Sequence, residues 1–317
     1  MYYLGIDLGG TNIAAGVINE KFEIIGRGKV KTRAPRPAAE IVQDMYTAGK
    51  AAVEDAGLTL SDIHSIGVGA PGTVDPETGV IGFSNNLDFH NEPIADMLKT
   101  HFGKEVYINN DANVAAYGEF LAGCGVGTKD FIAITLGTGV GGGVIIDGKI
   151  FSGMNFAGAE LGHVVIANDG APCTCGRKGC WESYASATGL IRQTKEAMEK
   201  HPDSKMWEIA GSLDKVNGLT AFDAMRAGDA AGAAVTDQYI EYIACGITNV
   251  INIFQPEILC IGGGISAEGD NLLKPIRAYV EENRFSKHTE KQTVIKKAEL
   301  GNDAGIIGAA CLYKLYE

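Results

Sequence analysis

The sequence predicts an α/β protein built from two related halves, and three observations support this. Short apolar segments with strand character alternate along the chain with stretches of helical periodicity. Glycine accounts for 43 of the 317 residues, and many of these glycines gather in tight turns. A motif near the start of the chain also recurs in its second half. Because 317 residues are more than one hydrophobic core usually serves, we expect two domains.

The first half follows this alternation closely. Residues 2–7 and 13–18 are typical of two strands joined by the turn Leu8-Gly-Gly-Thr-Asn12, which has few large side chains. Apolar residues recur at helical spacing from Ala38 to Ala56, and Gly57 is expected to end that helix. The other expected elements are strands at 22–30, 63–69 and 106–108, and helices at 93–101 and 112–122.

The second half begins like the first. Residues 4–18 align without a gap on residues 132–146, and in both places an apolar strand, a Leu-Gly turn and a second apolar strand follow one another. Such a pattern can also arise by chance, but the offset is close to a domain length. The other expected elements are helices at 183–198, 229–254, 271–282 and 304–316, a strand at 257–261, and a polar insertion at 200–219.

These elements predict the domain organisation. We expect a small α/β domain at 1–122 and a large α/β domain at 123–303. The apolar helix at 304–317 is expected to pack back on the small domain.

Composition argues against several classes of partner. The net charge of −12 would repel a nucleic-acid backbone. Arg27, Lys29, Lys31 and Arg33 alternate along the chain, as expected for the solvated face of a strand. No apolar run approaches the roughly twenty residues that cross a bilayer. We therefore expect a soluble, cytoplasmic protein that binds neither nucleic acid nor membrane.

One histidine and three cysteines lie close together in residues 163–180, namely His163, Cys173, Cys175 and Cys180. One imidazole and three thiolates form a closed tetrahedral set that suits structural zinc. Free cysteines or a disulfide are the alternatives, but three of only seven cysteines in one glycine-spaced loop favour metal. Four protein ligands leave no open coordination position. We therefore expect zinc to hold the loop and its flanking carboxylates, Glu160 and Glu182, rather than to activate water.

Two glycine turns could cradle phosphate oxygens. Asp7-Leu-Gly-Gly-Thr11 and Leu136-Gly-Thr-Gly-Val-Gly-Gly-Gly143 both offer bare backbone N–H groups and a threonine hydroxyl. Each turn alone could equally be a tight hairpin, but a third glycine turn at 262–264 favours a nucleotide. There is no Walker A lysine, and no G-x-G-x-x-G opens a helix after the first strand, so neither a P-loop enzyme nor a dinucleotide enzyme fits.

The segment Asn109-Asn-Asp-Ala-Asn113 lies where a strand is expected to end and a helix to begin. Asp111 could simply cap that helix. Two asparagines before it favour a polyhydroxyl ligand instead, because amide groups and a carboxylate can hold several hydroxyls, and ligands bind at strand ends in α/β sheets.

Together these motifs resemble the ROK family of bacterial sugar kinases, repressors and related proteins, and the likeness is greatest to the glucokinases of that family. The resemblance covers the chain from residue 2 to the last helix. The motifs that carry it are Asp7-x-Gly-Gly-Thr11, Asn109-Asn-Asp-Ala-Asn113, Leu136-Gly-Thr-Gly-x-Gly-Gly-Gly143, Glu160-x-Gly-His163 and Cys173-x-Cys-Gly-x-x-Gly-Cys-x-Glu182.

The resemblance implies a two-domain, actin-like (ribonuclease H-like) ATPase fold with a sugar cleft between duplicated halves, usually as a dimer or tetramer. It implies a glucokinase that transfers the γ-phosphate of ATP to the 6-hydroxyl of glucose with Mg²⁺ and structural Zn²⁺. Asp111 would be the general base, at an ordinary pKa. The residues implied to hold the sugar are Asn86, Asn110, Asp111, Glu160, His163 and Glu182. Those implied at the nucleotide and magnesium are Asp7, Gly9, Gly10, Thr11, Asn12, Gly137, Thr138, Gly139, Gly262, Gly263 and Gly264.

Several points stay open within this resemblance. Around Asn86 the match is looser, because Phe89 stands where many members carry tryptophan. A kinase for another sugar such as N-acetylmannosamine, fructose or allose is an alternative, and so is a sugar-responsive regulator, although the latter would need a helix-turn-helix module. A zinc-stabilised binding protein without catalysis is a third alternative, and the presence of Asp111 argues against it. His163 would serve zinc with one ring nitrogen and the sugar with the other. Because the phosphate turns lie elsewhere in the sequence, loss of zinc is expected to weaken sugar binding and to change nucleotide binding little.

Overall fold

The computed structural model describes residues 1–317, which form two compact units. The first unit consists of residues 1–133, 143–159 and 298–317, and the second of residues 134–142 and 160–297. The α/β domains expected from the sequence, at 1–122 and 123–303, remain a prediction. None of the helices combines the length and the apolar character needed to cross a bilayer.

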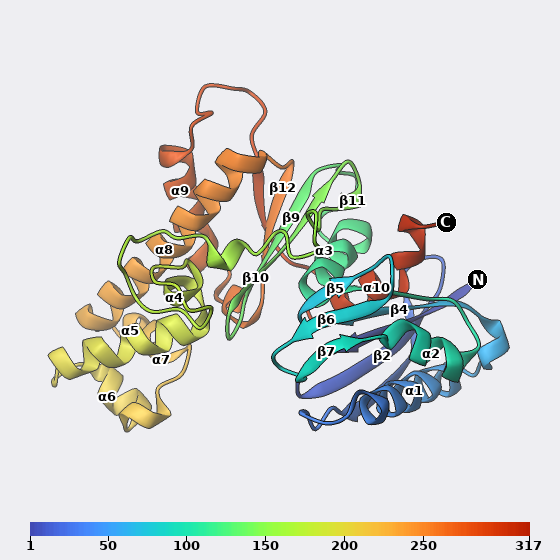
Figure 1. Ribbon diagram of the computed structural model, residues 1–317. Helices are drawn as coiled ribbons and strands as arrows, with labels where there is room; N and C mark the ends of the chain where they lie inside the picture. The colour runs from blue at the N-terminus through green and yellow to red at the C-terminus, as the bar shows by residue number, and fades with distance from the viewer. The chain divides into compact units, whose positions relative to one another are not determined.

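The first unit is built on a five-stranded sheet with the order β3-β2-β1-β4-β8 (Figure 1). Its strands are β1 (Tyr2–Leu8), β2 (Asn12–Ile18), β3 (Ile24–Lys31), β4 (Ile63–Ala70) and β8 (Val106–Asn110). β1, β2 and β3 pair antiparallel, whereas β1, β4 and β8 pair parallel. The carboxyl ends of these three parallel strands therefore meet at one edge of the sheet.

Helices cover both faces of this sheet. Along β1, Leu4 faces Gly49 of α1 (Ala38–Asp55), whereas the next residue, Gly5, faces α10 (Asp303–Ala310). α10 also packs against α3 (Asp111–Ala122), and this is the most extensive helix–helix contact of the unit. A Cβ added to Gly308 would lie 1.8 Å from the carbonyl oxygen of Val114, so this crossing of α10 and α3 requires glycine.

A small three-stranded sheet in the first unit was not expected from the sequence. It has the order β5-β6-β7, with β5 (Thr73–Asp75), β6 (Val80–Ser84) and β7 (Phe89–Glu92), and α2 (Ile94–Phe102) follows it. Strands of three to five residues carry too little periodicity to be recognised in a sequence. Phe89 is buried in the core of the unit.

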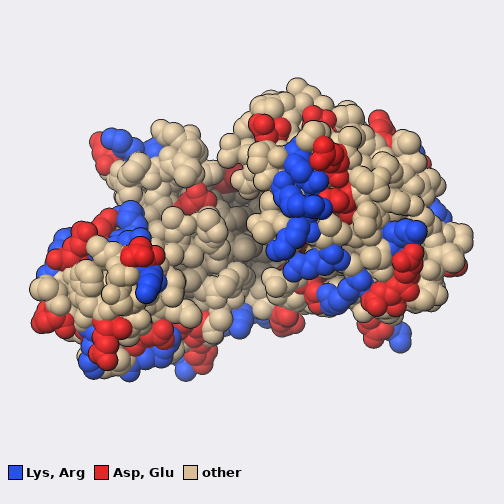
Figure 2. All heavy atoms as spheres, turned by 90° about the horizontal axis from the view of Figure 1, so that it is seen from below, with Lys and Arg blue, Asp and Glu red and all other residues tan.

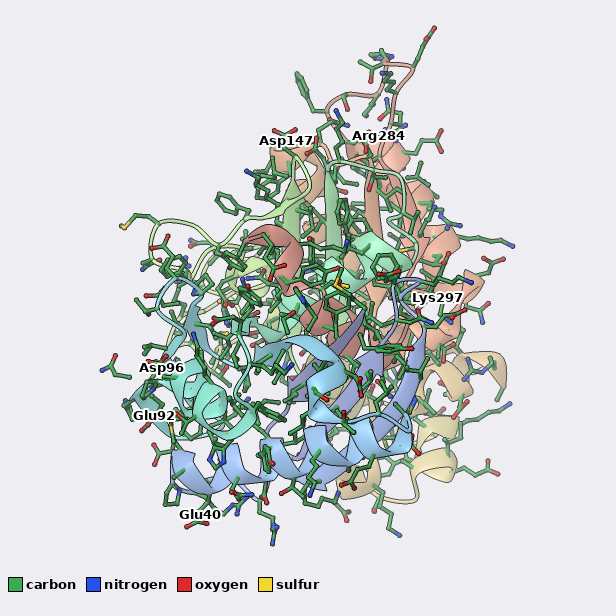
Figure 3. The ribbon with its side chains drawn as sticks, turned by 90° about the vertical axis from the view of Figure 1, so that its right-hand side faces the viewer. Glu40, Glu92, Asp96, Asp147, Arg284 and Lys297 are labelled. Atoms are coloured by element: carbon green, nitrogen blue, oxygen red, sulfur yellow. The ribbon has the colours of Figure 1, made fainter.

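The labelled acidic side chains Glu40 of α1 and Asp96 of α2 point outward (Figure 3), and both are exposed.

The second five-stranded sheet repeats the strand order of the first. Its order is β11-β10-β9-β12-β13, with β9 (Phe131–Leu136), β10 (Val140–Ile146), β11 (Lys149–Ile150), β12 (Ile258–Gly262) and β13 (Val294–Lys297). In the first sheet β4 and β8 extend the run β3-β2-β1 beyond β1. In the second sheet β12 and β13 extend the run β11-β10-β9 beyond β9 in the same way. The internal repeat seen in the sequence, residues 4–18 on 132–146, corresponds to β1–β2 and β9–β10.

The helices of the second unit are α4 (Glu182–Ala185), α5 (Ala187–Lys200), α6 (Lys205–Ala210), α7 (Thr220–Arg226), α8 (Ala230–Phe254) and α9 (Asp270–Asn283). The expected helix at 183–198 is in fact two helices, because Ser186 has an extended backbone (φ −77°, ψ 164°) and its hydroxyl caps α5 by accepting from Gly189 N. The stretch at 200–219 also has more structure than expected, since α6 buries Met206 completely.

The alternating cations of β3 lie as expected, with Arg27, Lys29 and Lys31 exposed. Arg27 forms a bidentate ion pair with Asp303, in which Nη1 donates to Oδ1 at 2.7 Å and Nη2 donates to Oδ2 at 2.8 Å. In the face shown in Figure 2, one strip of basic side chains is bordered by acidic ones, and elsewhere the two signs are interspersed.

Candidate functional site

The first glycine turn joins β1 to β2 and is held from outside by Thr32. Gly9 N donates to Asn12 O at 3.0 Å, which closes the turn. The fully buried Thr32 donates its hydroxyl to Gly9 O at 2.6 Å and its N–H to Thr11 O at 3.0 Å. Gly10 and Thr11 remain exposed. Sequence reasoning missed Thr32, which no motif marks.

Two carboxylates lie at the carboxyl edge of the first sheet. Asp7 pairs with Gly69 of β4, and Gly69 pairs with Asn109 of β8, so the three positions form a row across the sheet. Asp111 begins α3 directly after β8. Burial, and then the nearby Asp111, raise the pKa of Asp7 to about 6. Asp7 and Asp111 are therefore close enough for their charges to interact.

Burial also raises the pKa of the Asp111 carboxyl, whereas its hydrogen bonds oppose the rise. The sequence-based assumption of an ordinary pKa is therefore wrong, because the position in the fold partly removes this carboxyl from water. Its Oδ1 accepts from Ala112 N at 2.8 Å. The cap of α3 is Asn110, whose Oδ1 accepts from the N–H groups of Ala112 and Asn113 at 2.9 and 3.2 Å. Asn110 and Asp111 thus share the N–H of Ala112 at the start of α3.

Asn110 and Asn109 hold this strand end in shape. Asn110 Nδ2 donates to Gly72 O at 3.0 Å, and the same side chain hydrogen-bonds the Asp111 carboxyl. Asn109 is buried, and its Oδ1 accepts from Asn110 N at 2.8 Å and from Asn113 Nδ2 at 3.2 Å. Asn109 therefore stabilises the end of β8, and its buried side chain is not accessible to a ligand.

Asn86 belongs to the same unit and lies near the first glycine turn. It is exposed on the connection between β6 and β7. A Cβ added to Gly10 would lie 3.6 Å from Asn86 Cβ. The structure thus brings Asn86 beside the first glycine turn, and separately brings Asp7 together with Asp111, all within the first unit.

In the second unit the predicted metal ligands come together. The ligand atoms of His163, Cys173, Cys175 and Cys180 all lie within 4.8 Å of one another. Cys175 Sγ is 3.6 Å from Cys180 Sγ, and Cys173 Sγ is 3.5 Å from His163 Nδ1. Sulfurs that lie 2.3 Å from a tetrahedral zinc are about 3.8 Å apart, and a nitrogen and a sulfur slightly less. The donor set and its spacing fit zinc.

Backbone contacts fold the loop that carries these ligands. Cys173 N donates to Arg177 O at 2.9 Å, and Gly179 N donates to Ala171 O at 2.8 Å. Gly179 has φ +78°, and an added Cβ would lie 1.7 Å from Ala167 O, so the spacing of the cluster requires this glycine. After the last ligand, Trp181 is buried against Gly246 of α8.

The two carboxylates that flank the cluster differ in their surroundings. Glu182 is partly buried, and its Oε2 accepts from Val140 N at 3.0 Å. Glu160 is exposed, and its backbone carbonyl accepts from His163 N at 3.1 Å. Since His163 Nδ1 faces the cysteines, its Nε2 is the ring nitrogen left for another partner.

The second and third glycine turns lie together in the second unit. Gly263 has φ +84°, and an added Cβ would lie 2.2 Å from Leu136 O, directly before the turn Gly137–Gly139. Thr138 is exposed, as are Gly263 and Gly264. Bare backbone and one hydroxyl therefore gather at the carboxyl ends of β9 and β12, which is where ligands bind in α/β sheets.

Comparison with known proteins identifies the family of this chain. The model of the ROK family matches residues 3–315. A glucokinase of Halalkalibacterium halodurans is 38% identical over 100% of this chain and 96% of its own, and one of Thermotoga maritima is 36% identical over 98% and 96%. The crystal structure of a ROK family glucokinase from Streptomyces griseus in complex with glucose and AMPPNP has a TM-score of 0.82 at 36% identity, covering 98% of this chain and 99% of the other. The predicted α/β fold of the actin-like type is confirmed.

Proposed function

This chain belongs to the ROK family, and from that premise we propose that it is a glucokinase, which transfers the γ-phosphate of ATP to the 6-hydroxyl of glucose. The observation that carries the proposal is Asp111, a partly buried carboxylate that follows β8 at the carboxyl edge of a parallel sheet. The glucokinase relatives support the choice of sugar and of phosphate donor.

We propose Asp111 as the general base. Transfer of a phosphoryl group to an alcohol requires that the hydroxyl lose its proton as the new bond forms. A carboxylate with a raised pKa accepts that proton more readily than an ordinary one, provided that it is still ionised at the working pH. Asn110 supports this role by capping α3 at Ala112 and Asn113 and by hydrogen-bonding the Asp111 carboxyl.

We propose Asp7 as the residue that faces magnesium. Magnesium, when bound, neutralises phosphate charge. A nearby cation would also stabilise the ionised forms of Asp7 and Asp111, whose pKa values are both raised in its absence. The first glycine turn (Gly9, Gly10, Thr11 and Asn12) and the second (Gly137, Thr138 and Gly139) would hold ATP phosphates, and Gly262, Gly263 and Gly264 would lie near adenosine.

The residues that we propose to hold the sugar are Asn86, Asn110, Glu160, His163 and Glu182. Amide groups can donate to and accept from hydroxyls, whereas carboxylates accept from them, and a sugar that lacks one hydroxyl would leave a polar group unpaired. We propose that His163, Cys173, Cys175 and Cys180 hold a structural zinc ion, with His163 Nδ1 toward the metal. The zinc would fix the ring so that Nε2 can face a hydroxyl.

The direct test is ATP-dependent phosphorylation across a panel of glucose, N-acetylmannosamine, fructose and allose. Glucose is expected to have the highest kcat/KM. A higher value for one of the others would replace glucose as the substrate, and no turnover with any of them would refute the kinase proposal.

The role of Asp111 is tested by Asp111→Asn, which keeps the shape and removes the base. Loss of a general base costs roughly 10² to 10⁴ in rate, whereas glucose binding measured by calorimetry should be retained. Asp96→Asn, which removes an exposed carboxylate of α2, is the control and should retain full activity. Near-normal kcat in Asp111→Asn would show that this carboxylate is not the base.

A homo-oligomer remains a prediction, which light scattering can test.

A further inference from the structure

The break between α4 and α5 lies directly against the second glycine turn. Ala187 N donates to Gly137 O at 2.8 Å, and Thr188 Oγ1 donates to Thr138 O at 2.8 Å. A continuous helix would engage Ala187 N within the helix itself. The extended backbone of Ser186 thus turns Ala187 N toward the glycine turn.

These two hydrogen bonds orient the carbonyl groups of Gly137 and Thr138, and they also orient the N–H groups that follow these carbonyls. The peptide unit is planar and trans, so the N–H that follows a carbonyl points the opposite way. Holding the carbonyls of Gly137 and Thr138 toward α5 therefore directs the N–H groups of Thr138 and Gly139 away from α5. A turn that binds phosphate must present N–H groups and keep its carbonyl oxygens back.

Glu182 holds the far end of the same turn. Its Oε2 accepts from Val140 N at 3.0 Å, and a Cβ added to Gly139 would lie 2.3 Å from that oxygen. Residues 182–188 therefore hold the turn at Gly137 and Thr138, and hold Val140 directly after it.

The same carboxylate adjoins the metal cluster. Cys173 Sγ lies 3.9 Å from Glu182 Oε1, and Cys180 precedes Glu182 by two residues. Trp181, between them, donates from Nε1 to Tyr242 O at 2.8 Å and so anchors this stretch to α8. Glu182 thus has one oxygen beside the cysteine loop and the other on the glycine turn.

We propose that residues 182–188 are a clamp that sets the shape of the second glycine turn, with Thr188 as a positioning residue and with Glu182 coupling the turn to the zinc loop. The inference rests on the proposed function in treating this turn as a phosphate site. It changes the expectation that zinc loss leaves nucleotide binding nearly unchanged, because Glu182 reaches the turn through space although the two are far apart in sequence.

Thr188→Val tests the clamp, because it removes the hydroxyl and keeps the shape of the side chain, and Thr188→Ser is the matched control that keeps the hydroxyl. The dissociation constant for a non-hydrolysable ATP analogue, measured by calorimetry, should rise roughly 2- to 12-fold in Thr188→Val, as expected for one hydrogen bond. It should stay near the parent value in Thr188→Ser. The dissociation constant for glucose should change in neither. An unchanged affinity for the ATP analogue in Thr188→Val, or an equal loss in both variants, would overturn the role of Thr188.

Amide hydrogen exchange in the peptide 134–142 reads the turn without relying on activity. Thr188→Val, Glu182→Ala and removal of zinc by a chelator should each speed exchange there. Glu182→Ala should do so while zinc content by elemental analysis stays at the parent level. Unchanged exchange after zinc removal would overturn the coupling. If the parent protein phosphorylates no hexose, the proposed function fails, whereas faster exchange in these three samples would still support the clamp.

Discussion

Asp7 should make the ligand-free protein less stable at neutral pH than it would be with an uncharged residue there. Burial, and then Asp111, raise the pKa of Asp7 from its ordinary value of 3.8 to about 6. In the unfolded chain the carboxyl ionises near pH 4, whereas in the fold it keeps its proton until about pH 6. The stabilising contribution is therefore complete below the unfolded pKa and is lost as the pH rises through the folded pKa.

The size of this loss follows from the two pKa values. A difference of about two pH units corresponds to about 3 kcal/mol, and the loss is reached in full above the folded pKa. At pH 5 about half of this loss of stability has occurred. Asp7→Asn removes the charge and retains the shape. It should therefore raise the free energy of unfolding by about 1.5 kcal/mol at pH 5 and about 3 kcal/mol at pH 8.

Urea denaturation of both proteins at pH 5 and pH 8, without magnesium or nucleotide, measures this difference. Asp303→Asn is a control of opposite sign, because hydrogen bonds from Arg27 lower the pKa of Asp303. The stabilisation by Asp303 is present above its unfolded pKa and is lost as the pH falls, so Asp303→Asn should destabilise the protein at pH 8. A destabilised Asp7→Asn, or a gain equal at both pH values, would refute the reasoning. The more stable variant should also lose phosphotransfer activity if Asp7 faces magnesium.

Three further variants test other parts of the structure. Gly308→Ala would place a Cβ 1.8 Å from Val114 O and should lower the free energy of unfolding in urea by about 1 to 3 kcal/mol or more, whereas Gly82→Ala, whose Cβ would meet nothing closer than 3.6 Å, should change it little. Glu119→Ala would leave the N–H groups of Cys124, Glu299 and Leu300 without this carboxylate, which should cost about 3 kcal/mol or more in the same assay, and a loss below about 1 kcal/mol would contradict this. Cys175→Ser should abolish stoichiometric zinc in elemental analysis and raise the glucose KM while circular dichroism still shows a folded protein; full zinc content or an unchanged KM would count against the zinc site.

Sequence alone determined the features that depend on neighbours along the chain. Periodicity predicted both ends of α1 and of α8 within one residue, because each helix has an apolar face and a stop signal, Gly57 or the turn before Pro256. The repeat of residues 4–18 at 132–146 predicted the duplicated hairpins, and the spacing of His163 and the cysteines predicted that their ligand atoms would meet. These patterns are local, so their signal is present in a single sequence.

Only the tertiary structure decided the contacts between distant segments. The sequence of residues 183–198 indicates one continuous helix. In the structure Ser186 breaks it, and Ala187 and Thr188 bind the turn at Gly137 and Thr138, about fifty residues away in the chain. In the same way, no pattern marks Thr32 as the support of the first turn, and nothing near Asp7 in the sequence shows that Asp111 will raise its pKa. Desolvation and hydrogen bonding depend on which groups share a region of space, and the packing of the whole chain sets that proximity.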